Sequence, residues 1–292
     1  MLPGYLPLVT QILITGLFAL SLDVALGYAG ILTVGHAAFL GAGAYAAGLF
    51  SLHVWPEPLT GLAAGCATGA LLGYLSSVLI VRGADLTRLM ITIGFGLLLY
   101  EAANQLGHIT GGADGLQGIS IAPLFGVFRF DLAGKTAYVY CLVVVVLAVA
   151  LSAVVLRSPF GMALQGIRQN KKRMDALGSN VHSRLRMAYC ISAALAATAG
   201  ALMVQTTQFV GIDSLSFARS AEILIVLILG GTGRLYGGLV GAAVFVLVHD
   251  ALSHYEPQYW MVGLGIFLIV FVLVDKGGGL WSVVSRSTGG RG

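Results

Sequence analysis

The feature that most constrains this chain is a succession of apolar runs, each about 20 residues long, the length that crosses a bilayer as a helix. Only a helix satisfies the backbone polar groups of such a run within the run itself. With 58% hydrophobic and 10% charged residues, the chain has no stretch from which a sizeable soluble domain could fold. We therefore predict an all-α protein, a polytopic transmembrane helical bundle in which residues 1–292 form a single domain.

The apolar runs predict about 8–10 spans in total. The runs that can be bounded are residues 7–27, 31–50, 59–81, 86–107, 136–156, 187–209, 219–233, 235–249 and 258–275. The second span, near 31–50, contains Gly35, Gly41, Gly43 and Gly48. These glycines allow it to break into half-helices, as helices on substrate pathways often do.

The third predicted span carries a glycine at every fourth position, namely Gly61, Gly65, Gly69 and Gly73. Residues four apart share one face of a helix. A face made of glycine lets the backbone of a neighbouring helix approach closely. We therefore predict that this span packs against another helix along a continuous groove.

Positive charge is concentrated in residues 157–186, which hold seven of the sixteen Lys and Arg residues. Lys and Arg gather in cytoplasmic loops, so this segment is predicted to be a cytoplasmic loop. Alternation of the spans then places Arg82, Arg88 and Arg234 on the same side and the loop 107–135 outside. The formal charge of +4 follows from this topology, so no nucleic-acid partner is expected.

The basic loop also has the sequence of a helical element. The dipeptide 158–159, Ser-Pro, predicts a helix start with the serine as the cap, and Gly178 predicts a stop, so a helix or a helix pair lies between. Met174, Leu177 and Val181 follow at spacings of three and four, which predicts a short exposed apolar stripe. Two interpretations stay open: an anchor on anionic membrane lipid, or a knob that fits a groove on a cytoplasmic partner.

Acidic side chains at or within the apolar spans are candidates for a translocation path, because charge at that depth usually faces protein or a water-filled route. They are Asp23, Glu101 and Glu222, and Asn104 shares a helical face with Glu101. Each has a plainer interpretation as a polar residue paired with a neighbouring helix. His36, at the start of the second span, is expected to hydrogen-bond a backbone carbonyl freed by a break there.

Two glycine-rich stretches are predicted to be turns. In TGGADGL, residues 110–116, Gly111 and Gly112 allow tight turns and Asp114 can bond locally. The segment is either a plain turn or, as the family resemblance given below implies, an outer gate or a contact with a substrate-binding protein. GGTGRLYGG, residues 230–238, lacks the lysine of a phosphate-binding loop, so we expect this chain not to bind ATP. No catalytic residue and no metal site are predicted.

Four stretches carry a resemblance to a known family: residues 27–47, 110–116, 158–181 and 227–242. Through them the chain resembles the LivM-type permeases of ATP-binding-cassette importers for branched-chain amino acids. The resemblance implies a non-catalytic permease of a bacterial or archaeal cytoplasmic (inner) membrane, with no cofactor of its own and ATP used by separate subunits. It also implies as partners a second permease, a pair of ATPase subunits and an extracytoplasmic substrate-binding protein.

Within the basic loop, the resemblance assigns the contact with the ATPase to MDALG, residues 174–178. The residues assigned to coupling are Arg168, Asn170, Lys171, Met174, Asp175, Ala176, Leu177 and Gly178. Residues 171–173, Lys-Lys-Arg, stand where the family has an acidic stretch.

Two questions stay open at this point. A rival from another class is an ion-coupled secondary transporter or channel that uses Asp23, Glu101 or Glu222 as its ion site. The substrate stays open among leucine, isoleucine, valine, urea and short amides, because the resemblance places selection mainly in the binding protein.

Overall fold

The computed structural model describes residues 5–83, 85–123, 134–255 and 265. Within these residues the chain is helical and has no strand; Leu116 and Val210 form an isolated antiparallel bridge. The predicted class, an all-α polytopic bundle, is confirmed. The predicted ninth span, residues 258–275, lies outside the described residues except for Gly265.

The main helices begin and end close to the predicted spans. Their bounds are α1 (Leu6–Asp23), continued by the π-helical turn η2 (Val24–Tyr28), α2 (Ala37–His53), α3 (Pro58–Ile80), α4 (Asp85–Gln105), α6 (Lys135–Arg157), α9 (Val181–Thr207), α10 (Phe217–Gly230) and α11 (Gly237–Tyr255). The short elements are α5 (Gly107–Thr110), η3 (Gly112–Asp114), α7 (Pro159–Gln169), α8 (Lys171–Ala176) and η4 (Ile212–Leu215). Of the described helices, five are long and apolar enough to cross a membrane: α1 with η2, α3, α4, α6 and α9.

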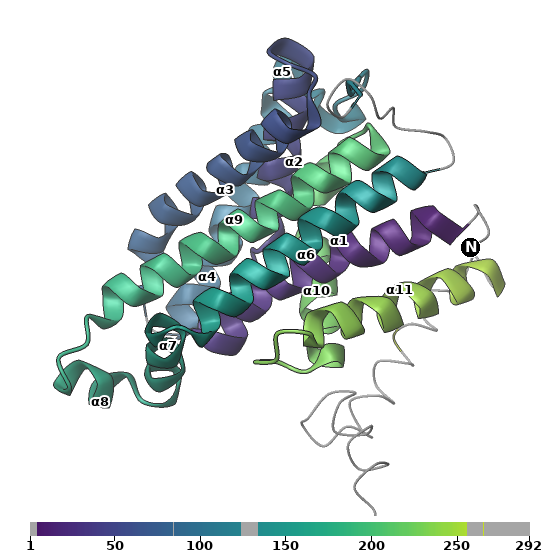
Figure 1. Ribbon diagram of the computed structural model, residues 1–292. Helices are drawn as coiled ribbons and strands as arrows, with labels where there is room; N and C mark the ends of the chain where they lie inside the picture. The colour runs from purple at the N-terminus through teal and green to yellow at the C-terminus, as the bar shows by residue number, and fades with distance from the viewer. Residues whose placement is uncertain (1–4, 84, 124–133, 256–264, 266–292) are drawn as a thin grey trace, which may run out of the picture.

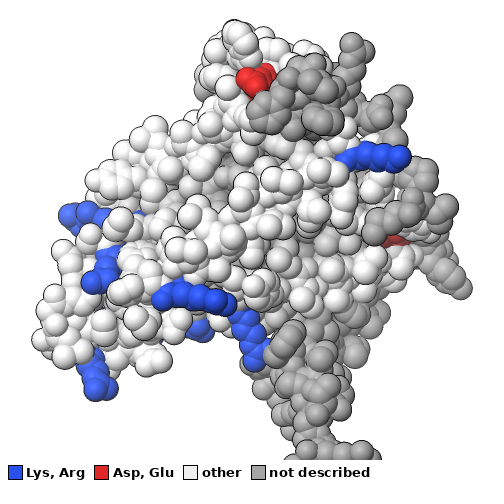
Figure 2. All heavy atoms as spheres, in the orientation of Figure 1, with Lys and Arg blue, Asp and Glu red and all other residues white. Residues whose placement is uncertain are grey.

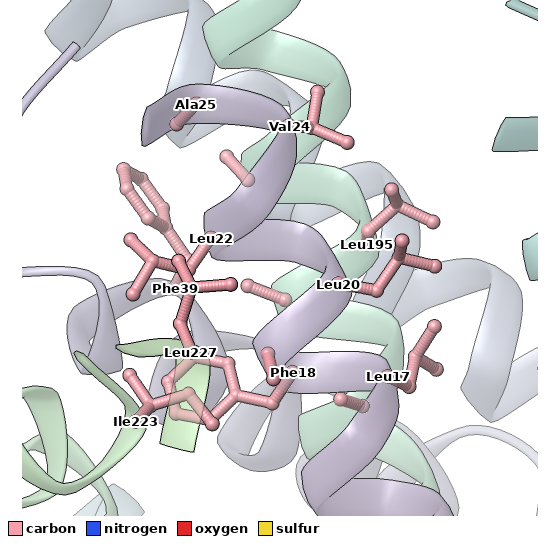
Figure 3. Packing of buried hydrophobic residues seen from close by; sticks show 14 of the residues in the cluster. Leu17, Phe18, Leu20, Leu22, Val24, Ala25, Phe39, Leu195, Ile223 and Leu227 are labelled. Carbon is pink, nitrogen blue, oxygen red and sulfur yellow. The ribbon is translucent and has the colours of Figure 1, made fainter. Parts of the chain in front are cut away.

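The core of the bundle forms around α1 and α9, which lie side by side (Figure 1). Leu17 and Leu20 of α1 lie on the same side of that helix as Leu195 of α9 (Figure 3). On the other side of α1, Phe18 lies toward Ile223 of α10. Because α1 has apolar neighbours on several sides, it is buried over most of its length, as expected for a helix that is hydrophobic all round.

The predicted glycine groove of α3 is confirmed, and α9 is the helix that fills it. A Cβ added at Gly65 would lie 2.9 Å from the Cβ of Ala201, and one added at Gly73 would lie 2.5 Å from the Cβ of Ala193. Ala197, midway between these alanines, meets Gly69. Small residues at every fourth position on both helices therefore bring the two backbones together.

Two crossings of the bundle are interrupted. Residues 30–36 are not helical, but α2 then runs unbroken from Ala37 to His53, so the predicted division of the second span into half-helices is wrong and only its start is non-helical. The second interruption precedes α10: the chain leaves α9 at Thr207, passes through η4 and becomes helical again at Phe217. The starts of α2 and α10 meet, because the backbone N–H of Ala37 donates to the Oγ of Ser220 over 3.0 Å.

The two ends of the bundle differ in charge. Most of the Lys and Arg side chains visible in Figure 2 lie at the end where Figure 1 places α7 and α8, and the middle of that face is uncharged. We call this the basic end; α5 lies at the opposite end. Arg88 also belongs to the basic end but is 4% exposed, because its guanidinium donates to the carbonyls of Ile80 and Val81 at the end of α3.

The α3–α9 seam yields the first prediction. Gly69→Ala should lower the thermal stability of the detergent-solubilised chain, because the new methyl would lie 2.7 Å from the carbonyl oxygen of Ala193. Gly94→Ala on α4 is the matched control, since a Cβ there meets nothing within 4 Å. Both changes gain the same helix propensity, so the Gly69 variant should be less stable than the control by about 1–3 kcal/mol. Equal melting temperatures would contradict the close packing.

Candidate functional site

The basic loop folds as a pair of short helices, α7 and α8, which is one of the two forms predicted for it. The helix start at Pro159 is confirmed, but Ser158 does not cap it: its Oγ donates instead to the carbonyl of Val155 over 2.6 Å. Asn170 caps α8 by accepting from the N–H of Arg173 over 3.0 Å. Gly178, at φ +79°, ends α8 as predicted, because this left-handed conformation suits glycine.

The exposed apolar stripe predicted on this loop is wrong in part. Leu177 is 72% exposed, but Val181 is buried at the start of α9. Met174 is half-buried, and its Sδ packs against Gly166 of α7. The prediction assumed one continuous helix from 174 to 181, whereas α8 ends at Ala176 and the chain then turns. Of the predicted stripe, therefore, only Leu177 is exposed, and Met162 of α7 is exposed as well.

The other predicted coupling residues lie on the outer surface of this helix pair. α8 has no buried residue, and Arg168, Asn170, Asp175, Ala176 and Gly178 are exposed, while Lys171 is half-buried. α7 is held to the bundle by Gly161, Leu164 and Ile167, which are buried. The pair therefore has one face fixed to the bundle and another that is largely exposed.

A cluster at the basic end joins α7 to three other elements; we call Asp23, Gly27, Arg168 and Gly233 the Asp23 junction. Asp23 is fully buried and accepts from the backbone N–H of Gly233 over 2.6 Å. The guanidinium of Arg168 donates to the carbonyl of Gly27 and also interacts with the Asp23 carboxylate electrostatically. The junction thus links α7 to the π-helical end of α1 and to the turn between α10 and α11.

Sequence reasoning identified Asp23 and Arg168 separately and missed Gly27 and Gly233. The tight turn predicted at residues 230–238 is confirmed, with Gly231 at φ +88° and Gly233 at φ +79°. A Cβ on Gly27 would lie 2.6 Å from the N of Gly233 and would also collide with Asp23. The glycine-rich composition of both segments was the available signal, but it did not reveal that they meet.

His36 lies where the second span is interrupted and is 1% exposed. Its Nε2 lies 3.0 Å from the Oγ of Ser21 and 3.4 Å from the Oγ of Ser192, while its ring stacks on Phe18. The expected partner, a freed backbone carbonyl, is therefore replaced by two serine hydroxyls. His36 joins the break to α1 and α9, and Val34 next to it is bonded to α4, since its N–H donates to the Oγ1 of Thr92 over 3.4 Å.

The remaining candidate residues of the translocation path do not converge on one site. Glu222, on α10, is paired with Arg219 of the same helix at 2.8 Å. Glu101 and Asn104 are exposed near the end of α4, where Glu101 accepts from the Nε2 of Gln105 over 2.7 Å. Asp23 lies at the basic end, and His36 lies at the break before α2. Their roles in transport stay predictions.

The glycine-rich segment at the opposite end forms tight turns, as predicted. Gly111, Gly112 and Gly115 have φ of +79°, +57° and +72°, and Asp114 is exposed. The bridge from Leu116 to Val210 then ties this segment to the chain just after α9, with a 2.8 Å hydrogen bond from the N–H of Leu116. The segment therefore lies next to the second interrupted crossing, and its role as a gate stays a prediction.

The apolar bundle with a surface helix pair at its basic end defines a polytopic helical membrane protein. The chain belongs to the family described as "Branched-chain amino acid transport system / permease component", whose sequence profile matches residues 4–273. It is thus a permease component of an ABC transport system.

Individual relatives agree on the class and differ in substrate. The chain is 29% identical over 296 residues to the "High-affinity branched-chain amino acid transport system permease protein LivM" of Escherichia coli (strain K12), covering 92% of this chain and 68% of the relative. The protein of the same name from Salmonella typhimurium gives the same values. The "Fructose import permease protein FrcC" of Rhizobium meliloti is 27% identical over 241 residues, covering 78% of this chain and 66% of the relative. No solved structure matches the chain significantly.

The Asp23 junction yields the second prediction. Gly27→Ala should separate Asp23 from Gly233, because the added methyl occupies the space between them. Overpacking of this kind costs about 1–3 kcal/mol, so the melting temperature should fall and uptake by the assembled transporter should fall with it. The exposed surface of α8 is untouched, so associated subunits should remain bound. Gly107→Ala is the control, since its Cβ would meet nothing closer than 3.7 Å. Unchanged uptake in the Gly27 variant would contradict the assigned importance of the junction.

Proposed function

We propose that this chain is one of the permeases of an ATP-driven importer for branched-chain or similar aliphatic amino acids, in a bacterial or archaeal cytoplasmic membrane. In this proposal it pairs with a second permease, receives substrate from an extracytoplasmic binding protein and docks its α7–α8 pair on an ATPase subunit. It performs no covalent chemistry, and ATP is hydrolysed by the partner subunits. Family membership supports the proposal, and the names of the LivM relatives support the substrate class.

The observation that carries the ATP-driven mechanism is the form of the helix pair. α7 is anchored through buried Leu164 and Ile167, whereas α8 has no buried residue and is followed by exposed Leu177. An exposed leucine beside Lys172 and Arg173 suits a protein groove with an apolar floor and acidic edges. The Asp23 junction supplies a direct connection from this pair to α1.

The third prediction separates docking from lipid anchoring. Leu177→Ser with Gly178→Val leaves the charge of the loop unchanged, so membrane insertion should survive. It removes the exposed apolar side chain and places a β-branched residue at φ +79°, where it is strained. Burying a leucine is worth roughly 1.5–3 kcal/mol, so the ATPase subunits should no longer co-purify and ATP-dependent uptake should fall.

Lys172→Gln is the matched control for this variant. It keeps Leu177 and changes one exposed charge, so docking should weaken only modestly and more at low salt than at high salt. A Leu177/Gly178 variant that retains its ATPase subunits and normal uptake would show that the pair is a lipid-facing anchor.

The fourth prediction tests the ion-coupled alternative. If ATP supplies the work, an uncoupler that abolishes the proton gradient should leave uptake into proteoliposomes unchanged as long as ATP is held constant. The same should hold for Asp23→Asn, because the amide oxygen can still accept from the backbone N–H of Gly233. Uptake that needs the gradient and continues without ATP would instead favour the ion-coupled class.

A further inference from the structure

A cleft between α1, α10 and α11 carries polar side chains deep within the apolar bundle; these three helices lie together in Figure 1. Its lining includes Gln11 of α1, Arg219 and Glu222 of α10, and His249 of α11. Gln11, Arg219 and His249 lie about 16–18 Å along their helices from the basic end, at 1.5 Å per residue. These three side chains therefore lie at about the same level along the bundle, within helices that the sequence places in the apolar part of the bilayer.

The charged pair of this cleft is only partly covered. The Nη1 of Arg219 lies 2.8 Å from the Oε2 of Glu222, and each side chain is 40% exposed. Charge at this depth is expensive next to lipid and therefore faces protein, water or a polar ligand. The pair thus indicates that the cleft admits polar molecules.

The order of the two charges is the reverse of the order that stabilises a helix. Ser216 caps α10 by accepting from the N–H of Arg219 over 3.2 Å, which makes Arg219 the third helical residue. That position favours a glutamate, which completes a capping box and complements the positive end of the helix dipole. Arginine first and glutamate one turn later is also the weaker orientation for a side-chain pair. Helix stability therefore does not account for this arrangement.

Apart from Thr15, the rest of the cleft is apolar. The apolar wall includes Ile14, Phe18, Leu40, Ile223, Val226 and Phe245, and the volume of this partly open cleft is about 100 Å³. A second cavity of about 470 Å³ shares Gln11, Val246 and His249 with it and continues along α11 to Asp250 and Ser253. The two cavities are therefore neighbours, on the side of the charged pair that faces the far end of α11.

Two other cavities in the described part of the chain lack this combination. The largest, about 920 Å³ between α3, α6 and α9, includes Lys135 but no acidic side chain. The cavity of about 190 Å³ at the interrupted crossings is lined by Val34, Tyr100, Ser216 and apolar neighbours, with no charged residue. Neither places a cation and an anion beside an aliphatic wall.

We infer that the α1–α10–α11 cleft binds the transported amino acid, with the substrate carboxylate on Arg219, its ammonium on Glu222 and its aliphatic side chain along the apolar wall. One internal ion pair is exchanged for two pairs to the substrate, and the net charge of the cleft stays unchanged. A sugar offers neither charge to these groups, so the permease itself selects an aliphatic zwitterion. This inference rests on the proposed function and adds the substrate site to it.

The test exchanges the two charges in the complete transporter. Arg219→Glu with Glu222→Arg keeps an ion pair, places glutamate in the capping position and should be at least as stable thermally as the unmodified protein. It reverses the polarity that the substrate meets. The binding protein is supplied at a saturating concentration. We then expect the KM for leucine uptake into proteoliposomes to rise about ten- to a hundred-fold, which corresponds to the loss of charge-assisted hydrogen bonds to the substrate.

Arg219→Gln should raise the KM similarly, whereas Arg82→Gln, at an exposed arginine of the basic end, should leave it unchanged. A charge-exchanged variant that is stable and transports leucine with an unaltered KM would overturn the inference and leave the proposed function standing. An unmodified transporter that takes up fructose and no aliphatic amino acid would overturn both.

Discussion

Backbone polar groups that cannot reach water must be satisfied inside the bundle, and the rest of this structure depends on that requirement. The helices meet it within themselves. Where a crossing is interrupted, side chains of other helices take over: Ser220 accepts from the N–H of Ala37, and Thr92 accepts from the N–H of Val34. The break before α2 is therefore stabilised by α4 and α10, which supply these two acceptors.

The same cost of burying polar groups decides where the charges lie. Asp23 is tolerated at full burial because Gly233 and Arg168 compensate it, and Arg219 is compensated by Glu222. These two places are connected, since α1, α10 and α11 meet at the Asp23 junction and also line the cleft. Because α7 contacts the junction through Arg168, a movement of the helix pair would be transmitted to the helices around the cleft without passing through another helix.

Much of the fold could be predicted from local sequence patterns. The long apolar helices and the glycine face of α3 follow from composition and spacing within one segment, and the described residues confirm five such helices and the glycine face. The half-helices predicted for the second span are not formed, because α2 is continuous through its glycines. The surface stripe on the basic loop was predicted from helical spacing in the same way and is wrong in part. The spacing from Met174 to Val181 places these residues on one face only if a single helix contains them all. Gly178 ends the helix before Val181 is reached.

By itself, the sequence determined the class of protein, the positions of the helices, the basic end and the face on which α3 packs, because each depends on residues near one another in the chain. Only the tertiary structure decided which distant residues share a site. Asp23 and Gly233 are separated by 210 positions, and Arg168 and Gly27 by 141. Arg219 and Glu222 are only three residues apart, but the cleft that they line is completed by side chains of α1 and α11. Which helices become neighbours depends on how all their faces pack together, so it cannot be predicted from the sequence of any one segment.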